Sequence, residues 1–200
     1  MKKIFYALVS FVIIAGMAFS PITPLAIGSK MPMADLKMKS VSGKEISMKE
    51  VIKDKGVLVM FSCNTCPYVI KNQQRTKAIG DYAQKMNVGV ILVNSNEAQR
   101  SDDEAYTEMK KYAVTQKYNF NYVVDKNSQV ANAFGANRTP ECFLFDKKGT
   151  LVYHGAIDDS PTNPATVHRQ HLKEAINQLV EGKEITVKES KSVGCGIKRQ

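Results

Sequence analysis

The segment Ser62-Cys63-Asn64-Thr65-Cys66-Pro67 lies between two stretches of different periodicity. Residues 57–61 before it form an unbroken apolar run, as expected for a strand of a parallel sheet covered on both faces. After it, apolar residues recur at helical spacing as far as residue 86. The two cysteines therefore stand where a buried strand ends and a helix begins.

This junction favours thiol chemistry. The first turn of a helix has unpaired N–H groups and the positive end of the helix dipole, and both favour the thiolate, which is the nucleophilic form of cysteine. We expect Cys63 to be the attacking thiolate on the exposed side of the helix start, and Cys66, one turn further, to be the resolving thiol. The alternatives are an inert structural disulfide and half of a metal site, which would need a second cysteine pair or two histidines.

The rest of the chain predicts an α/β fold. Alternating residues at 35–41 and 44–48 predict an N-terminal β-hairpin. The predicted strands of the main sheet are 57–61, 88–93, 122–124, 142–145 and 151–153. Helices between the early strands require parallel pairing, whereas the last two strands form an antiparallel hairpin under a final helix. The result is a central mixed sheet flanked by helices, with an αβ insertion before Pro140.

Local signals predict where the helices begin and end. Ser101-Asp102-Asp103-Glu104 has the pattern of a capping box. Ser128 is expected to cap a short helix that Gly135 ends. Asn163-Pro164 is expected to open the last helix, which Gly182 ends.

Composition indicates one ordinary globular domain. The 200 residues are 44% hydrophobic and include four cysteines, so the chain can bury a core and is not a disulfide scaffold. Its 28 basic and 19 acidic residues give a net charge of +9. The basic residues are spread along the chain without a block of five. A solvated lysine-rich surface is therefore favoured, and we expect no nucleic-acid partner.

The N-terminus has the pattern of an export signal. Lys2 and Lys3 precede sixteen almost wholly apolar residues, 4–19, a run shorter than the roughly 20 residues of a spanning helix. We expect residues 1–20 to be a signal peptide or, if uncleaved, an anchor that makes the only membrane contact, and the protein to be extracytoplasmic. The predicted parts that follow are a linker at 21–32, a folded domain at 33–182 and a C-terminal tail at 183–200.

Cys63-x-x-Cys66 at a strand-to-helix junction, with Thr139-Pro140 opening a later hairpin, resembles the thioredoxin superfamily over residues 33–182. The leading hairpin and the insertion before Pro140 are similar to the redoxin branch, which includes AhpC/TSA-like peroxiredoxins and exported TlpA-like reductases. The resemblance implies a thioredoxin-like fold and a cis bond that places Pro140 beside Cys63. It also implies that Thr139 offers backbone hydrogen bonds to a substrate peptide.

The resemblance further implies an exported thiol–disulfide oxidoreductase that needs no cofactor. Cys63 would attack a substrate disulfide, and Cys66 would resolve the mixed disulfide by closing the Cys63–Cys66 bond. The partners would be protein or small-molecule disulfides and thiols, together with an electron donor. Thioredoxin relays protons through a buried acid, for which Glu97, just beyond a strand end, is the candidate here.

Two alternatives remain open. A thiol peroxidase would oxidise Cys63 to sulfenic acid, but peroxiredoxins carry Thr or Ser three residues before the reacting cysteine, where this chain has Met60. A Sco-like copper carrier would need a histidine near the cis-proline. The three histidines are instead interpreted as core or surface residues, without a metal site: His154, His168 and His171.

Two cysteines lie outside the motif. Cys142 shares a strand face with Leu144, so we expect a buried inert thiol, with a redox role as the alternative because Pro140 is two residues away. Cys195 lies between glycines in the tail. It has no function, or it reaches back to resolve a mixed disulfide, or it pairs with another chain.

Overall fold

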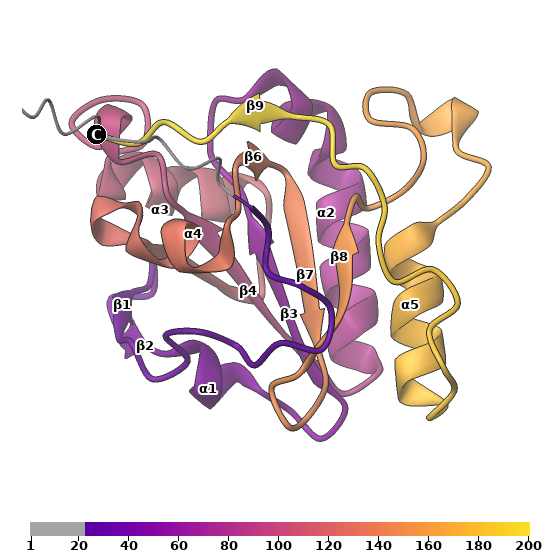
Figure 1. Cartoon of the computed structure of the whole chain (residues 1–200). Helices are drawn as coiled ribbons and strands as arrows, with labels where there is room; N and C mark the ends of the chain where they lie inside the picture. The colour runs from indigo at the N-terminus through magenta and orange to yellow at the C-terminus, as the bar shows by residue number, and fades with distance from the viewer. Residues whose placement is uncertain (1–22) are drawn as a thin grey trace, which may run out of the picture.

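A five-stranded mixed sheet lies at the centre of this computed structural model, which describes residues 23–200. The strand order is β5-β4-β3-β7-β8, and helices cover both faces of the sheet (Figure 1). The predicted α/β architecture is therefore confirmed. The predicted signal or anchor at residues 1–20 lies outside the described residues.

The elements follow the predicted order. The strands are β1 (Met38–Lys39), β2 (Glu45–Ile46), β3 (Gly56–Phe61), β4 (Val88–Asn94), β5 (Asn121–Val124), β6 (Arg138–Thr139), β7 (Glu141–Phe145), β8 (Leu151–Gly155) and β9 (Cys195–Gly196). The helices are α1 (Met48–Val51), α2 (Pro67–Lys85), α3 (Tyr106–Thr115), α4 (Gln129–Phe134) and α5 (His171–Val180). β1 and β2 pair antiparallel as the predicted hairpin, although each spans only two residues.

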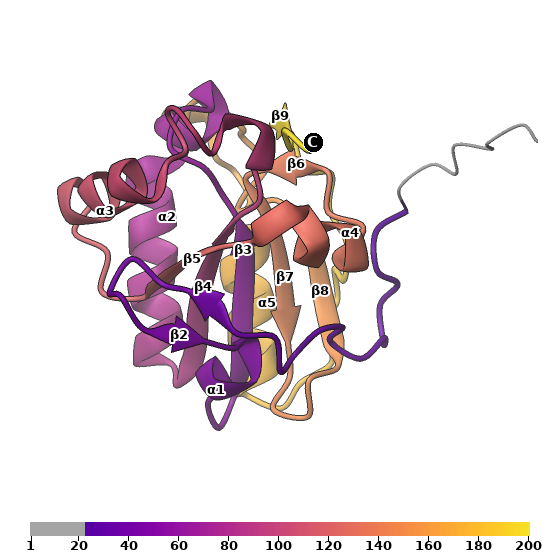
Figure 2. The same cartoon turned by 90° about the vertical axis from the view of Figure 1, so that its left-hand side faces the viewer.

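β3 is a central strand because both of its faces are apolar. It pairs parallel with β4 and antiparallel with β7, so that Val59 lies between Ile91 and Phe143. Because successive side chains of a strand point to opposite faces, Leu58 and Met60 enter a different core from Val59. Helices α2, α3 and α5 cover the Leu58 face, and α1 and α4 cover the Val59 face (Figure 2).

Two of the predicted helix caps are wrong. α3 begins only at Tyr106, and Glu104 is fully buried, so residues 101–104 are not its capping box. Asn163 caps a short 3₁₀ helix, Pro164–Thr166, whereas α5 begins later, at His171. Each of these caps was inferred from neighbouring residues alone. In the fold, Glu104 binds the cysteine loop and Asn163 caps a different helix from the predicted one.

Ser128 holds the N-cap position of α4, as predicted, but its side chain makes no capping hydrogen bond. The hydroxyl of Ser128 donates to the carbonyl oxygen of Ser95 at 2.7 Å. The carboxylate of Asp125 instead accepts the N–H groups of Val130 and Ala131 at 2.9 and 3.0 Å. Asp125 is fully buried, and burial raises the pKa of its carboxyl group.

The segments on either side of the predicted domain make hydrogen bonds to it. In the described part of the predicted linker, the N–H of Leu25 donates to the carbonyl oxygen of Phe134, and the N–H of Gly28 to that of Leu151. At the other end of the chain, β9 pairs antiparallel with β6. Among residues 23–200 we find no helix with the length and apolar character needed to cross a membrane.

Replacing Asp125 by alanine tests the cap that the structure reveals. Asp125→Ala is expected to lower the free energy of unfolding by about 1–2 kcal/mol, the usual cost of a lost helix cap, measured by urea denaturation. Asp102→Ala, at an exposed position of the rejected capping box, is expected to change it by less than about 0.5 kcal/mol. Equal effects of the two substitutions would contradict this assignment.

Candidate active site

The cysteine motif occupies the junction between β3 and α2, as the sequence predicts. The N–H of Ser62 donates to the carbonyl oxygen of Val93 at 3.0 Å, which extends the pairing of β3 beyond its last residue. Cys66 is the N-cap residue of α2, and Pro67 follows at the first helical position. A proline is tolerated there because the first N–H groups of a helix have no partner within the helix. Both cysteines are thus held between two rigid elements.

The disulfide in the structure joins Cys66 to Cys195, not to Cys63. The Cα atoms of Cys66 and Cys195 are 6.1 Å apart, although 129 residues separate them in sequence. Cys63 is a free thiol. The predicted Cys63–Cys66 bond is therefore absent from this state, and Cys195 is brought to the motif by the fold.

Cys63 is fully buried, so its predicted place on the exposed side of the helix start is wrong. Its Sγ lies 3.4 Å from the hydroxyl oxygen of Thr139. Burial, and then the negative charge of Glu104, raise the pKa of Cys63 to about 11. At neutral pH this thiol is therefore protonated, because desolvation and a neighbouring carboxylate both disfavour a thiolate.

Glu104 is a buried carboxylate that holds the loop between the two cysteines. Its oxygens accept the N–H of Asn64 at 2.9 and 3.0 Å and the N–H of Thr65 at 3.3 Å. They also accept the Thr65 hydroxyl at 3.0 Å and the Asn94 side-chain amide at 2.6 Å. A buried charge needs such partners because its desolvation cost is otherwise several kcal/mol.

A second layer of hydrogen bonds supports the same loop. The hydroxyl of Tyr122 donates to the side-chain carbonyl of Asn64 at 2.9 Å. The amide of Asn94 donates to that same hydroxyl at 2.8 Å, while it also reaches Glu104. The motif is therefore tied to the last residue of β4 and to Tyr122 within β5, which fixes the position of Cys63.

The bond between Thr139 and Pro140 is cis, as the resemblance implies. Thr139 touches both cysteines of the motif: its hydroxyl faces Cys63, and its carbonyl oxygen lies 3.4 Å from the Sγ of Cys66. Glu141 supports this segment, because its carboxylate accepts the N–H groups of Asn137 and Arg138 at 2.9 and 3.0 Å. Thr139 therefore lies beside both sulfur atoms of the motif.

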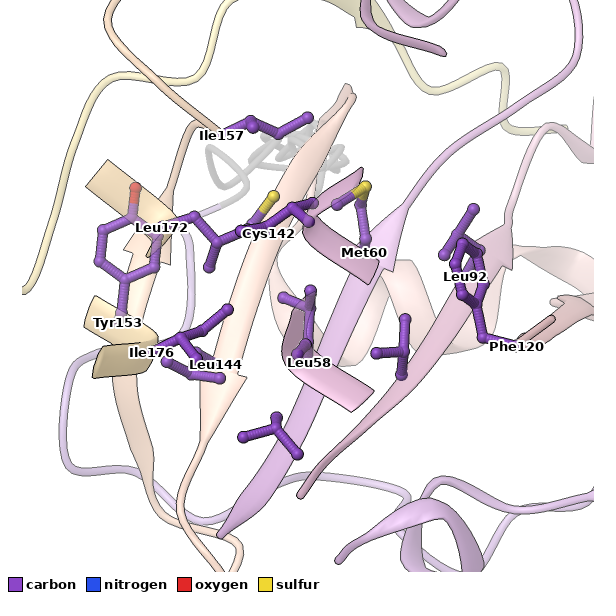
Figure 3. Close-up of a cluster of buried hydrophobic side chains, with 14 of the residues drawn as sticks. Leu58, Met60, Leu92, Phe120, Cys142, Leu144, Tyr153, Ile157, Leu172 and Ile176 are labelled. Atoms are coloured by element: carbon purple, nitrogen blue, oxygen red, sulfur yellow. The ribbon is translucent and has the colours of Figure 1, made fainter. Parts of the chain in front are cut away.

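The remaining candidate residues lie elsewhere. Glu97, the predicted proton relay, forms an ion pair with Arg100 at 3.2 Å, and the acid at the motif is Glu104. His154 contacts the carboxylate of Glu141 at 2.7 Å. Cys142 is fully buried in the core under α5, among Met60, Leu144 and Leu172 (Figure 3), and burial raises its pKa far above the ordinary value.

Sequence reasoning missed Glu104 as a residue of the site, whereas the bond between Cys66 and Cys195 agrees with the predicted alternative in which Cys195 reaches back to the motif. Glu104 ends an acidic run whose other members, Asp102 and Asp103, are exposed, so periodicity alone could not separate it from them.

The sequence is similar to known proteins over about two thirds of the chain. The family model described as "AhpC/TSA family" matches residues 27–154. The chain is 27% identical over 133 residues to the thiol-disulfide oxidoreductase ResA of Geobacillus thermodenitrificans, covering 66% of this chain and 71% of that protein.

Solved structures of two further proteins are similar over most of their length. An uncharacterized conserved protein from Geobacillus kaustophilus gives a TM-score of 0.81 at 30% identity, covering 88% of this chain and 93% of that chain. A hypothetical protein from Sinorhizobium meliloti gives 0.81 at 28% identity, covering 89% and 97%.

The fold and a cysteine pair beside a cis-proline define an oxidoreductase of the redoxin branch of the thioredoxin superfamily. Since the family model covers more than half of the chain, the chain belongs to the AhpC/TSA family.

The buried environment of Cys63 predicts a steep pH dependence of its alkylation. In the oxidised protein, with Cys142→Ala to remove the other free thiol, the rate of iodoacetamide labelling is expected to rise up to a midpoint near pH 11. Glu104→Gln removes the negative charge and is expected to move this midpoint to lower pH. Circular dichroism checks that the variant is folded, and a midpoint at or below pH 9 in the parent would contradict the assignment.

Proposed function

We propose that this protein is an exported thiol–disulfide oxidoreductase whose redox dithiol is Cys63 and Cys66. The observation that carries the proposal is the meeting of a free thiol and a disulfide at one residue: Cys63 and the disulfide-bonded Cys66 both contact Thr139. A thiol held next to a disulfide sulfur is the starting arrangement for thiol–disulfide exchange. The similarity to ResA of Geobacillus thermodenitrificans, named a thiol-disulfide oxidoreductase, supports it.

In the reducing direction, the reaction starts from two thiols. The thiolate of Cys63 attacks a substrate disulfide, a mixed disulfide forms, and the first substrate sulfur leaves as a thiol. The thiolate of Cys66 then attacks the Sγ of Cys63, which releases the second substrate sulfur and closes the Cys63–Cys66 bond. The substrate gains two electrons and the dithiol loses two, and an electron donor must reopen the bond.

Three groups assist this exchange in the proposal. Glu104 is a positioning residue, because it holds the backbone of Asn64 and Thr65 without touching a sulfur atom. The hydroxyl of Thr139 hydrogen-bonds to Cys63 in either protonation state. Pro140 and Thr139 form the edge at which an extended substrate peptide would lie.

The environment of Cys63 favours the reducing direction. A dithiol becomes a strong oxidant when its reduced form is stabilised, most often as a thiolate. In the structure, where Cys66 is bonded to Cys195, burial and Glu104 raise the pKa of Cys63 to about 11. Because Glu104 is held by the cysteine loop itself, we propose that its charge also disfavours the thiolate in the reduced pair. The protein is therefore proposed to reduce its substrates.

The activity is tested by the reduction of insulin with dithiothreitol. Cys63→Ser and Cys66→Ser are each expected to lower the rate to that of dithiothreitol alone, because each removes a sulfur atom that must form a bond. Cys142→Ala, in the buried core, is the control and is expected to keep the parent rate. Activity that survives in Cys66→Ser would contradict the two-cysteine mechanism, while peroxide consumption dependent on Cys63, or stoichiometric retention of Cu(I), would favour the two alternatives.

The direction is tested by glutathione titration of the Cys63–Cys66 pair in a Cys142→Ala, Cys195→Ser background. We expect a potential near that of thioredoxin, about −270 mV, rather than near about −120 mV, the value of a strong oxidant. A potential close to the second value would reverse the proposed direction.

Export is proposed from the charged and apolar residues at 2–19. A fusion of residues 1–32 to alkaline phosphatase, which is active only where disulfides form, is expected to be active in a bacterial host. Replacing two central apolar residues, Val12 and Ile13, by arginine is expected to abolish that activity. Equal activity of both fusions would contradict export by this segment.

A further inference from the structure

The C-terminal tail crosses the top of the sheet and runs over the cysteine motif. Figure 1 shows the yellow segment passing from the side of α5, over β6, to the side of α4. β9 pairs antiparallel with β6, so that Cys195 lies opposite Thr139 and Gly196 opposite Arg138. The tail therefore occupies the same edge at which a substrate peptide would pair.

Hydrogen bonds hold the tail on both sides of Cys195. Before it, the hydroxyl of Ser190 accepts the N–H of Ala156 at 2.9 Å. After it, the N–H of Ile197 donates to the carbonyl oxygen of Asn137 at 3.1 Å. The N–H of Lys198 also donates to the side-chain oxygen of Asn96 at 3.0 Å. The tail is thus anchored on both sides of Cys195, which it holds beside the motif in an extended conformation.

The residue before Cys195 has little room. A side-chain carbon added at Gly194 would lie 2.1 Å from the carbonyl oxygen of Thr139, which is a severe steric clash. A carbon added at Gly196 would lie 4.0 Å from the carbonyl oxygen of Asn137, which is an ordinary contact. The tail therefore approaches Thr139 closely on one side of Cys195 only.

We propose that Cys195 is a third redox-active cysteine and that residues 193–198 are an internal substrate of the Cys63/Cys66 site. The inference rests on the proposed function and adds two points to it. The tail competes with external substrates for the edge at Thr139, and the substrates that fit this edge are extended peptides with a glycine before the cysteine.

The internal reaction is an exchange between two disulfides. The sulfur of Cys63 loses its proton and attacks the Sγ of Cys66, so that the net proton movement of the step is from Cys63 to Cys195. The Cys63–Cys66 bond forms, the Cys66–Cys195 bond breaks, and the electron pair leaves on the sulfur of Cys195, which takes up a proton. One disulfide is present before and after, so the step consumes neither an oxidant nor a reductant.

The same arrangement accounts for the burial of the motif. Cys63, Cys66 and Val69 form a small apolar cluster on which Cys195 packs. While the Cys66–Cys195 bond holds the tail, Cys63 has no access to an external disulfide. Breaking that bond removes the covalent hold on β9, whose pairing with β6 spans only two residues.

The test uses the full chain and a matched pair of glycine substitutions. Wild type, Gly194→Ala and Gly196→Ala are equilibrated in glutathione buffer, quenched with acid and alkylated, and their disulfides are mapped by mass spectrometry. Wild type is expected to show both Cys66–Cys195 and Cys63–Cys66. Gly194→Ala is expected to lower the ratio of the first to the second by roughly fivefold or more, because the tail must move off Thr139. Gly196→Ala is expected to leave the ratio within about twofold of wild type, since its added carbon makes only an ordinary contact.

Two cysteine variants separate this inference from the proposed function. Cys63→Ser is expected to remain locked as Cys66–Cys195, and Cys195→Ser to form only Cys63–Cys66 and to reduce insulin with a lower KM than wild type. A wild type that never shows both disulfides, or equal ratios in the two glycine variants, would overturn the internal exchange while leaving insulin reduction intact. Loss of insulin reduction in both wild type and Cys195→Ser would instead overturn the proposed function.

Discussion

The site depends on the contacts of Thr139 more than on any other single residue. Its hydroxyl faces Cys63, its carbonyl oxygen faces Cys66, and its backbone pairs with Cys195. Glu141 and the strand pairing of β7 with β3 fix the segment that carries it. The two cysteines of the motif and the distant Cys195 therefore meet at one residue at the end of the sheet. A small movement of this residue would change all three contacts together.

A buried carboxylate is the second constraint on the site. Glu104 is satisfied by backbone and side-chain donors from the cysteine loop and from β4, so its charge is tolerated in the interior. That charge lies close enough to Cys63 to raise the thiol's pKa further above the value that burial produces. The interaction that orders the loop thus also disfavours the thiolate, which is the basis for proposing a reducing enzyme. The covering of its substrate edge is a separate proposal, which rests on the pairing of β9 with β6.

Much of the fold was predictable because it rests on short-range patterns. The apolar run at 57–61, the periodic helix after Cys66 and the hairpin formed by β7 and β8 all appear where alternation and helical spacing place them. Helix caps were less predictable. Asp125 caps α4 from four residues before its first residue. Glu104 lies just before α3 and accepts hydrogen bonds from the distant cysteine loop instead of capping that helix. Both are acidic residues before a helix, and local sequence does not distinguish the two uses.

The sequence by itself determined that two cysteines follow a buried strand and open a helix, and that Thr139-Pro140 precedes a hairpin. These are properties of neighbouring residues, because periodicity and turn chemistry act over a few positions. Only the tertiary structure decided which cysteine pairs with Cys66, that Cys63 is buried, and which acid lies beside it. Disulfide connectivity depends on the distance between chain segments in space. The pairing of β9 with β6 sets that distance across 129 residues of sequence.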